Sequence, residues 1–297
     1  MKQFLVKILF FLGFTLFYFF GNMIINYYIY SSESPVIENS SILISGDSHT
    51  QKSLNPKLFD NAQNISQSAE PYIVTYWKLK NIFKIYQPDT LILGFAQHNI
   101  AKFNDHKFSD EKWSSEMFKR TYTIQEFKTI ENVVDINFYN FYKTLWKQTA
   151  FYPKKTHTNY LGEYSNNRSD NVANWESAIR RHFYYNGKTN EVSMIAIDYL
   201  DSIINLCRKK EIAVVLASNP VSEQYLDNIP LSIMAKFNAL KNKYKDGVII
   251  FDKTSDSTYS DSLFLDADHL NEYGAKKFTS ELRMFLKNEF SIYNKAN

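Results

Sequence analysis

The chain alternates between short apolar runs and longer stretches in which apolar and polar residues recur with a helical period. The nearly continuous apolar runs are Ser41–Gly46, Thr90–Phe95, Ile212–Ser218 and Gly247–Asp252. Runs of this length are typical of strands that are covered on both faces of a parallel sheet. The amphipathic stretches, which predict helices, are Pro71–Gln87, Val192–Lys210, Leu231–Tyr244 and Glu272–Phe290. Alternating strands and helices predict an α/β domain with a mostly parallel sheet.

One region departs from this alternation. From about Ile100 to Asn190 the sequence is aromatic, polar and irregular, and Phe138–Pro153 is its one clear helical pattern. We interpret the region as an insertion between the strand that ends near Phe95 and the helix that follows near Val192. The α/β domain is therefore expected over residues 41–297, interrupted at about 100–190.

The first thirty residues have a different pattern. No charge lies between Lys7 and Glu33, and Phe, Leu and Ile cover every side of the predicted helix. The run is long enough to cross a bilayer. Lys2 and Lys7 precede it and acidic residues follow it, so the positive-inside rule places the N-terminus in the cytoplasm and the rest of the chain outside. We therefore expect a transmembrane anchor over residues 1–30 and a linker over 31–40.

A cleaved signal peptide is the alternative reading of the same segment. The run is longer than a typical signal-peptide core, and its exit "NYYIYSSESP" lacks a small-x-small cleavage site. No cysteine is present there to accept a lipid. These features favour an anchor that is retained.

Composition narrows the function classes. The chain has 297 residues, 44% of them hydrophobic, and a formal net charge of +3 with its basic residues dispersed. A nucleic-acid partner is therefore not expected. The single cysteine, Cys207, excludes an internal disulfide, and its position on an apolar helix face predicts a place in the core.

Candidate chemistry follows the strands. In an open parallel sheet, ligands bind beyond the carboxyl ends of the strands. Ser48 lies just after the first strand in "GDSHT", and Asp266 and His269 lie after the last one in "DADH". A serine hydroxyl needs a base to act as a nucleophile, and an aspartate three residues before a histidine can hold the ring by Nδ1–H. The bland alternatives are an ordinary Gly-Asp-Ser turn and a helix cap by Asp266 or Asp268.

The two motifs together resemble the SGNH, or GDSL-type, hydrolase superfamily. The resemblance runs from about Ile42 to Phe290 without the insertion, and "GDSHT" with "FLDADHLNEYGAKKF" is most similar to the membrane-tethered branch associated with acyl transfer to surface polysaccharides and cell-wall polymers. It implies a flavodoxin-like three-layer α/β/α fold and hydrolysis or transfer of esters. It also implies that Ser48 is the nucleophile, His269 the general base and Asp266 the residue that orients the base.

The family's middle motifs match less well. The family has a glycine whose backbone N–H contributes to the oxyanion hole, and here Ser66 of "NISQSAE" takes its place. Where the family has an oxyanion-binding Asn, this chain has Ala96, and Asn99 or His98 is the candidate substitute. One such donor contributes about 3 kcal/mol to lowering the barrier.

The remaining histidines give weaker signals. His49 is expected to be a surface or substrate-facing neighbour of Ser48. His106, His157 and His182 are scattered through the insertion without ligand spacing, so we expect no metal site and no cofactor.

Three functions remain open at this point. The first is a membrane-anchored serine esterase or O-acyltransferase that acts on an acylated extracytoplasmic glycan, supplied in the transferase case by a membrane acyl-donor partner. The second is a general carboxylester hydrolase or lipase. The third is a non-catalytic member that binds acylated glycans or scaffolds an envelope assembly.

Overall fold

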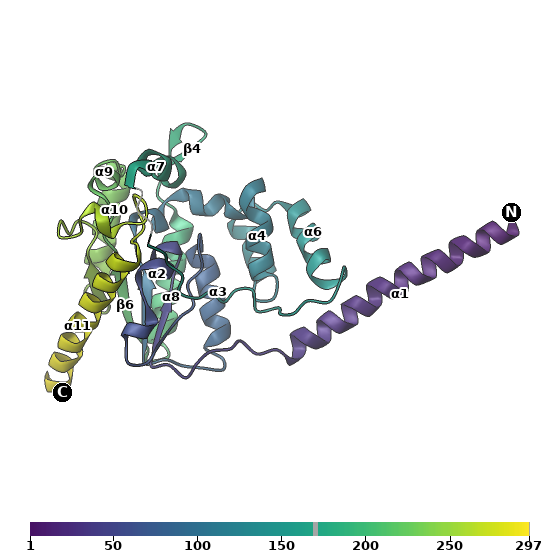
Figure 1. Cartoon of the computed structure of the whole chain (residues 1–297), viewed down its shortest axis with the longest axis horizontal. Coiled ribbons are helices and arrows are strands. Elements are labelled where there is room, and N and C mark those ends of the chain that lie inside the picture. The colour runs from purple at the N-terminus through teal and green to yellow at the C-terminus, as the bar shows by residue number, and fades with distance from the viewer. Residues whose placement is uncertain (169–171, 297) are drawn as a thin grey trace. The chain divides into compact units, whose positions relative to one another are not determined.

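The computed structural model describes residues 1–168 and 172–296, and the chain divides into two compact units (Figure 1). The helical unit comprises Met1–Val36 and His106–Tyr160, and the sheet unit comprises Ile37–Asp105 and Leu161–Asn297. The predicted insertion at about 100–190 therefore contributes residues to both units.

The sheet unit is built on a five-stranded parallel sheet. Its strands are β1 (Ile42–Ser45), β2 (Ala62–Asn64), β3 (Thr90–Gly94), β6 (Ala213–Ser218) and β7 (Ile249–Asp252). Their order is β2-β1-β3-β6-β7, and every neighbouring pair is parallel. Counted along the chain this is the 2-1-3-4-5 order of flavodoxin-like sheets, in which the strand order reverses between β1 and β3. The four predicted strands are confirmed, and the short edge strand β2 is the one that the sequence pattern did not reveal.

Helices cover both faces of the sheet. The helices and strands that complete this unit are α2 (Ser48–Ser53), α3 (Tyr72–Ile82), α7 (Trp175–Phe183), α8 (Met194–Arg208), α9 (Glu223–Asp227), α10 (Leu231–Tyr244), α11 (Glu272–Ala296) and the hairpin β4 (Tyr184–Tyr185) and β5 (Lys188–Thr189). Short 3₁₀ turns are η1 (Pro56–Leu58), η2 (Gln97–Ile100), η3 (Lys102–Phe108), η4 (Val172–Asn174) and η5 (Asp261–Leu263). The predicted three-layer α/β/α sandwich is thus confirmed.

The two apolar layers follow from the alternation of side chains along each strand. Ile44, Ile92 and Val215 point to one face, where they join a core cluster with residues of α11. Leu43 and Leu216 alternate with them and are equally buried. Right-handed crossovers place α3, α8 and α10 on that second face, where α8 contacts both α3 and β6. Each fully buried leucine or isoleucine stabilises the fold by about 2 kcal/mol.

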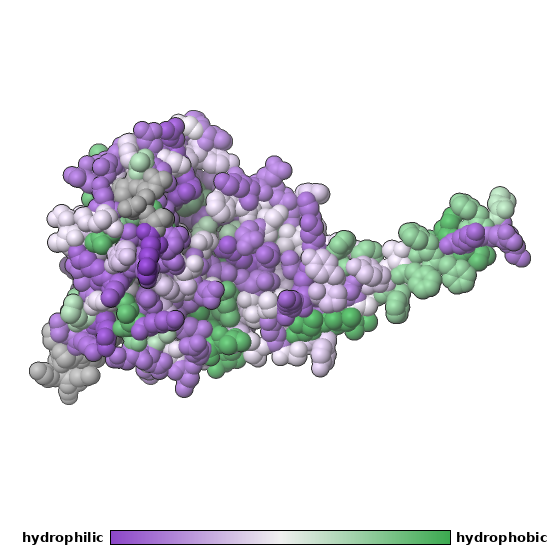
Figure 2. Space-filling model, viewed as in Figure 1, coloured by the Kyte–Doolittle hydropathy of each residue, from purple (hydrophilic) through white to green (hydrophobic). Residues whose placement is uncertain are grey.

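The helical unit consists of α1 (Lys2–Ser32), α4 (Glu111–Thr121), α5 (Phe127–Val133) and α6 (Phe138–Thr149). The prediction of one helix in the insertion was therefore too low, because α4 is largely polar and its apolar stripe is narrow. Helix α1 is apolar along its length and is long enough to span a membrane or act as a signal anchor. Figure 2 shows its apolar surface, with hydrophilic residues near its N-terminal end.

Candidate active site

The site begins where β1 and β3 end, at the point where the strand order reverses. Gly46 and Gly94 close these strands, and the Thr50 side chain of α2 fills the space beside them. A Cβ at Gly46 would lie 2.4 Å from the Thr50 hydroxyl, and one at Gly94 would lie 1.9 Å from it. The two glycines therefore allow α2 to approach the strand ends closely. This approach sets Ser48, the first residue of α2, at the carboxyl edge of the sheet.

Asp47 fixes the start of α2. Its Oδ1 accepts a hydrogen bond from the backbone N–H of His49 at 3.0 Å, which caps the helix. Its Oδ2 accepts from His98 Nε2 at 2.5 Å and from the Asn99 amide at 2.7 Å. Asp47 therefore joins the loop after β1 to the loop after β3.

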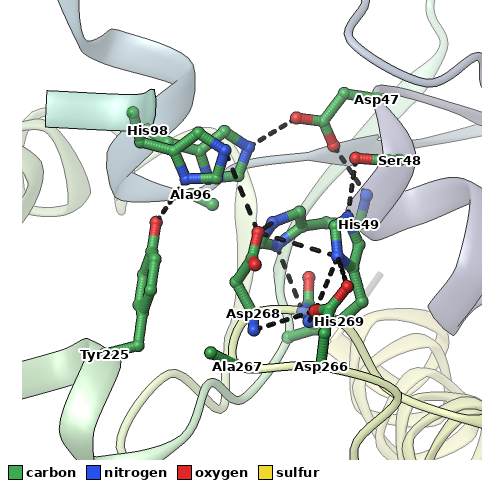
Figure 3. Close-up of polar contacts among 12 residues, drawn as sticks. Asp47, Ser48, His49, Ala96, His98, Tyr225, Asp266, Ala267, Asp268 and His269 are labelled. Carbon is green, nitrogen blue, oxygen red and sulfur yellow. Dashed lines mark hydrogen bonds and ion pairs between the residues drawn. The ribbon is translucent and has the colours of Figure 1, made fainter. Parts of the chain in front are cut away.

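Ser48, His269 and Asp266 form one chain of hydrogen bonds (Figure 3). Ser48 Oγ lies 2.8 Å from His269 Nε2, and His269 Nδ1 lies 2.9 and 3.0 Å from the two carboxylate oxygens of Asp266. Ser48 is partly exposed, whereas the His269 side chain is buried. The structure therefore brings together the three residues that the sequence suggested would act as a unit, in the order serine, histidine and aspartate.

Asp266 also shapes the loop that carries His269. Its Oδ1 accepts from the backbone N–H groups of Asp268 and His269, at 3.1 and 2.8 Å. The start of α11 is held by another residue, because Asn271 Oδ1 accepts from the N–H groups of Tyr273 and Gly274. The alternative in which an aspartate caps this helix is therefore not what the structure contains.

A second link joins the same two segments. His49 Nδ1 faces the Asn219 amide at 3.3 Å, so its Nε2–H donates to Asp268 Oδ2 at 3.0 Å. Both side chains are buried. The expectation that His49 lies at the surface is therefore wrong, because Asp268 and Asn219 bind both ring nitrogens inside the protein. Two bonds, Ser48 to His269 and His49 to Asp268, thus join adjacent residues of α2 to adjacent residues of the loop before α11.

Further histidines continue inward from this link. The ring of His49 lies 4.6 Å from that of His269 and 4.1 Å from that of His98, and His98 stacks on His182 at 4.7 Å. His182 Nδ1 in turn contacts the Tyr225 hydroxyl at 2.7 Å. His182 comes from α7, in the region where the sequence indicated only scattered histidines, so its role in the site was missed.

The electrostatic environment separates one histidine from the others. Burial, with the neighbouring His49, lowers the pKa of His98 to about 4, and burial holds the pKa of His182 well below its ordinary value. Burial also lowers the pKa of His269, but the Asp268 carboxylate and the hydrogen bond that His269 donates to Asp266 outweigh it, so the net shift is upward. A raised pKa makes His269 the best proton acceptor of these three.

Comparisons with known proteins add little to this geometry. No family model and no curated protein matches the chain. A candidate acylhydrolase from Bacteroides fragilis NCTC 9343 aligns with a TM-score of 0.41 and 11% identity, over 89% of this chain and 93% of that one. A structure described as a candidate platelet activating factor from Streptococcus pneumonia aligns with a TM-score of 0.42 and 12% identity, over 95% and 98% of the two chains.

The two predicted oxyanion residues are placed differently. The Ser66 N–H, proposed from the sequence as a donor, is already bonded to Asn64 Oδ1 at 2.9 Å. Asn99 is buried beside Asp47, with its Oδ1 accepting from the Ala96 N–H at 2.8 Å and its amide facing Asp47. Of the two, Asn99 is the one that lies next to the Ser48 segment. Its amide nitrogen carries a second hydrogen besides the one given to Asp47.

Three of the site residues are also close enough together to hold a cation. Ligand atoms of His49, Asp268 and His269 lie within 4.8 Å of one another. In the present arrangement, however, His49 donates to Asp268, and His269 is bonded on both nitrogens to Ser48 and Asp266. A metal would have to displace these bonds. The donor set therefore fits proton transfer better than metal binding.

Asp268→Asn tests the origin of the raised pKa. A base must be unprotonated to act, so turnover should fall as the pH drops through the pKa of His269, which lies above the ordinary value of 6.5. The substitution removes the buried charge that favours the protonated ring, while its amide oxygen can still accept from His49. We expect the acidic limb of the kcat/KM profile to move to lower pH. Asp261→Asn, an exposed change in η5, should leave the limb in place, and an unshifted limb in Asp268→Asn would contradict the assignment.

Proposed function

We propose that the chain is a membrane-anchored serine esterase or O-acyltransferase. The supporting observation is the continuous hydrogen-bonded path from Ser48 Oγ through His269 to Asp266. The pKa of His269 is raised. The adjacent Asp268 bonds to His49, which joins the loop that carries His269 to the helix that carries Ser48. Such a path is the requirement for activating a serine hydroxyl.

The first half-reaction transfers the acyl group to the protein. Ser48 Oγ attacks the carbonyl carbon of an ester while His269 Nε2 takes the hydroxyl proton, and Asp266 stabilises the imidazolium that forms. The negative charge on the carbonyl oxygen is received by the backbone N–H of Ser48 and the Asn99 amide, each contributing about 3 kcal/mol. The C–O bond then breaks, the alcohol leaves with the proton from His269, and the acyl group remains on Ser48.

The second half-reaction decides between hydrolysis and transfer. His269 now removes a proton from an incoming hydroxyl, which attacks the Ser48 ester and regenerates the serine. Water gives the free acid, and a sugar hydroxyl gives an acylated glycan. The same residues serve both outcomes, so acceptor binding rather than the triad determines which one dominates.

An extracytoplasmic glycan is the acceptor we favour. Tyr184 and Tyr185 are exposed on the hairpin that directly follows α7, the helix whose Arg181 and His182 lie near Asp268. Exposed tyrosine rings beside a site are suited to stacking on sugar faces. The charge pattern around α1 supports an extracytoplasmic location for the site, where an acyl donor would come from a membrane partner held at high effective concentration.

The test uses the full chain in detergent micelles. Mass spectrometry after treatment with a fluorophosphonate should find Ser48 modified. With an activated acetyl ester as donor, acetate release and acetylated oligosaccharide are then measured with and without an oligosaccharide acceptor. We expect Ser48-dependent acetyl transfer or acetate release from acetylated sugars.

Each competing function has its own outcome. A clear preference for long-chain lipid esters would replace the glycan esterase with a lipase. Failure of Ser48 to react with the fluorophosphonate in folded protein, together with binding of acetylated oligosaccharide, would replace the enzyme with a glycan-binding protein.

A further inference from the structure

One face of α1 is attached to the rest of the helical unit by polar side chains. Asn22 donates to the Phe151 carbonyl at 3.1 Å, and Asn26 donates to the carbonyls of Thr149 and Tyr152 at 2.9 and 3.0 Å. Asn22 and Asn26 are the buried residues of a helix whose other faces are exposed. Directly after the helix, Glu33 accepts from the N–H of His157 at 2.6 Å. The C-terminal third of α1 is therefore part of a folded structure rather than a free tether.

The length that precedes these contacts matches a bilayer. The segment from Lys2 to Gly21 has twenty residues, which rise about 30 Å as a helix, the thickness of a hydrocarbon core. Its two charged residues, Lys2 and Lys7, lie in its first two turns, where their long apolar stems let the ammonium groups reach the headgroups on the N-terminal side. Polar contacts between this segment and the rest of the helical unit begin near its C-terminal end, where the Tyr18 hydroxyl donates to the Phe151 carbonyl. The outer edge of the hydrocarbon layer therefore falls close to Asn22.

Helix α6 lies at this level. The ring of Trp146 contacts that of Phe19 at 4.8 Å. The inner side of α6 is buried, with Asn140 bonded to Ser114 and Phe141 packed on Phe118 of α4. Its outer side and two residues that follow shortly after it present exposed aromatic rings: Phe138, Tyr139, Tyr142, Trp146, Phe151 and Tyr152. We call these six residues the aromatic face.

Lysines accompany these rings. Lys143 Nζ lies 5.1 Å from the centre of the Tyr139 ring, and Lys154 Nζ lies 3.6 Å from that of Tyr152. Tyrosine and tryptophan, which combine an apolar ring with a polar group, are common where lipid headgroups meet the acyl chains. Lysine is also found there, because its long apolar stem can lie among the chains while its ammonium group reaches the headgroups. Lysine also pairs favourably with anionic headgroups.

We propose that the aromatic face lies in the headgroup region of the bilayer that α1 crosses. The inference rests on the proposed membrane anchorage and is independent of the chemistry at Ser48. Lipid is expected to cover this face because the face is continuous, through the contact of Trp146 with Phe19, with the segment proposed to span the membrane. The helical unit is then held to the membrane by both α1 and α6, which fixes its depth as well as its attachment.

The experiment measures the depth of Trp146 in the full chain. The protein is reconstituted into vesicles of phosphatidylcholine and phosphatidylglycerol that contain phosphatidylcholine brominated either near the headgroup or near the chain end. The fluorescence of Trp146 is taken as the difference in tryptophan emission between the wild type and Trp146→Phe. We expect this signal to be quenched, and more strongly by the shallow bromines than by the deep ones.

Two further variants keep the result interpretable. Trp113→Phe on α4 leaves the aromatic face unchanged, so the amount of fluorescence that the bromines remove should be the same as in the wild type. Tyr142→Trp in the Trp146→Phe background places a new indole one turn away on the same face and should restore shallow quenching even if the first substitution perturbs local packing. If neither Trp146 nor the indole introduced by Tyr142→Trp is quenched, in protein that remains inserted by α1, the proposal is overturned and water or another protein covers the face.

Discussion

Replacing Ser48 with alanine is expected to lower kcat for ester turnover by roughly 10⁶-fold, leaving only what substrate binding and oxyanion stabilisation provide. The hydroxyl is the only group of Ser48 that bonds to His269 Nε2, so the substitution removes the atom that forms the acyl intermediate. His269→Ala should cost about as much, because the residues act as a unit. Asp266→Asn should cost roughly 10⁴-fold, since an amide favours the wrong ring tautomer.

The matched control is Ser280→Ala on α11. Among the residues that the structure describes, the Ser280 hydroxyl bonds only to the Lys276 carbonyl one turn earlier, and its loss should leave kcat unchanged. Initial rates with an activated acetyl ester, together with circular dichroism to verify folding, provide the measurement. Wild-type turnover by folded Ser48→Ala protein would show that the nucleophile lies elsewhere or that the reaction is not acyl transfer.

Lys78→Met is expected to cost about 3–5 kcal/mol of the free energy of unfolding. Lys78 of α3 is fully buried and donates to Glu70 Oε2 at 2.7 Å and to the Ile65 carbonyl at 2.8 Å. The other oxygen of Glu70 accepts from Thr75 at 2.7 Å. The substitution leaves a carboxylate inside the protein without its counter-charge, and the loop after β2 loses its support from α3.

A neighbouring lysine provides the comparison for this change. Lys80→Met, on the exposed side of the same helix, should alter stability by no more than about 0.5 kcal/mol. The double variant Glu70→Leu with Lys78→Met removes both charges and should recover much of the loss. Denaturant unfolding of the full chain in detergent measures all three. If Lys78→Met is no more destabilising than Lys80→Met, the buried pair does not support the fold.

The sequence predicted the fold best where burial requires a recognisable pattern of apolar residues. The four central strands were predictable because both faces of a parallel sheet are apolar, which makes runs such as Ala213–Ser218 nearly continuous. The edge strand Ala62–Asn64 has three residues and one apolar side chain, so it leaves no such run. Helix α4 was missed for the related reason that its buried side is narrow, with Met117 and Phe118 among mostly polar neighbours.

The site was predictable only as far as its motifs extend. Ser48, Asp266 and His269 could be proposed together because each motif follows a strand, an aspartate three residues before a histidine can hold its ring, and the two motifs resemble those of a known hydrolase superfamily. His49 follows Ser48 and Asp268 precedes His269 in the sequence. The sequence alone does not show that these two side chains, 219 positions apart, bond to each other. The prediction that Ser66 contributes to the oxyanion hole required a free backbone N–H. In the structure this N–H donates to the side chain of Asn64, two residues earlier, and the motif gave no sign of that bond.

The attachment of α1 has a consequence for the biogenesis of the protein. Asn22, Asn26 and Glu33 leave the ribosome before their partners in the segment Thr149–Thr158, which are 123 to 129 positions further along the chain. At about 5–20 residues per second, these side chains wait roughly 6 to 25 s for their partners. If α1 is the membrane anchor proposed above, these side chains wait at the edge of the bilayer, where water can bond to them; nearer the centre of the bilayer it could not. Insertion of the first helix would then precede the folding of the helical unit and provide the surface on which it assembles.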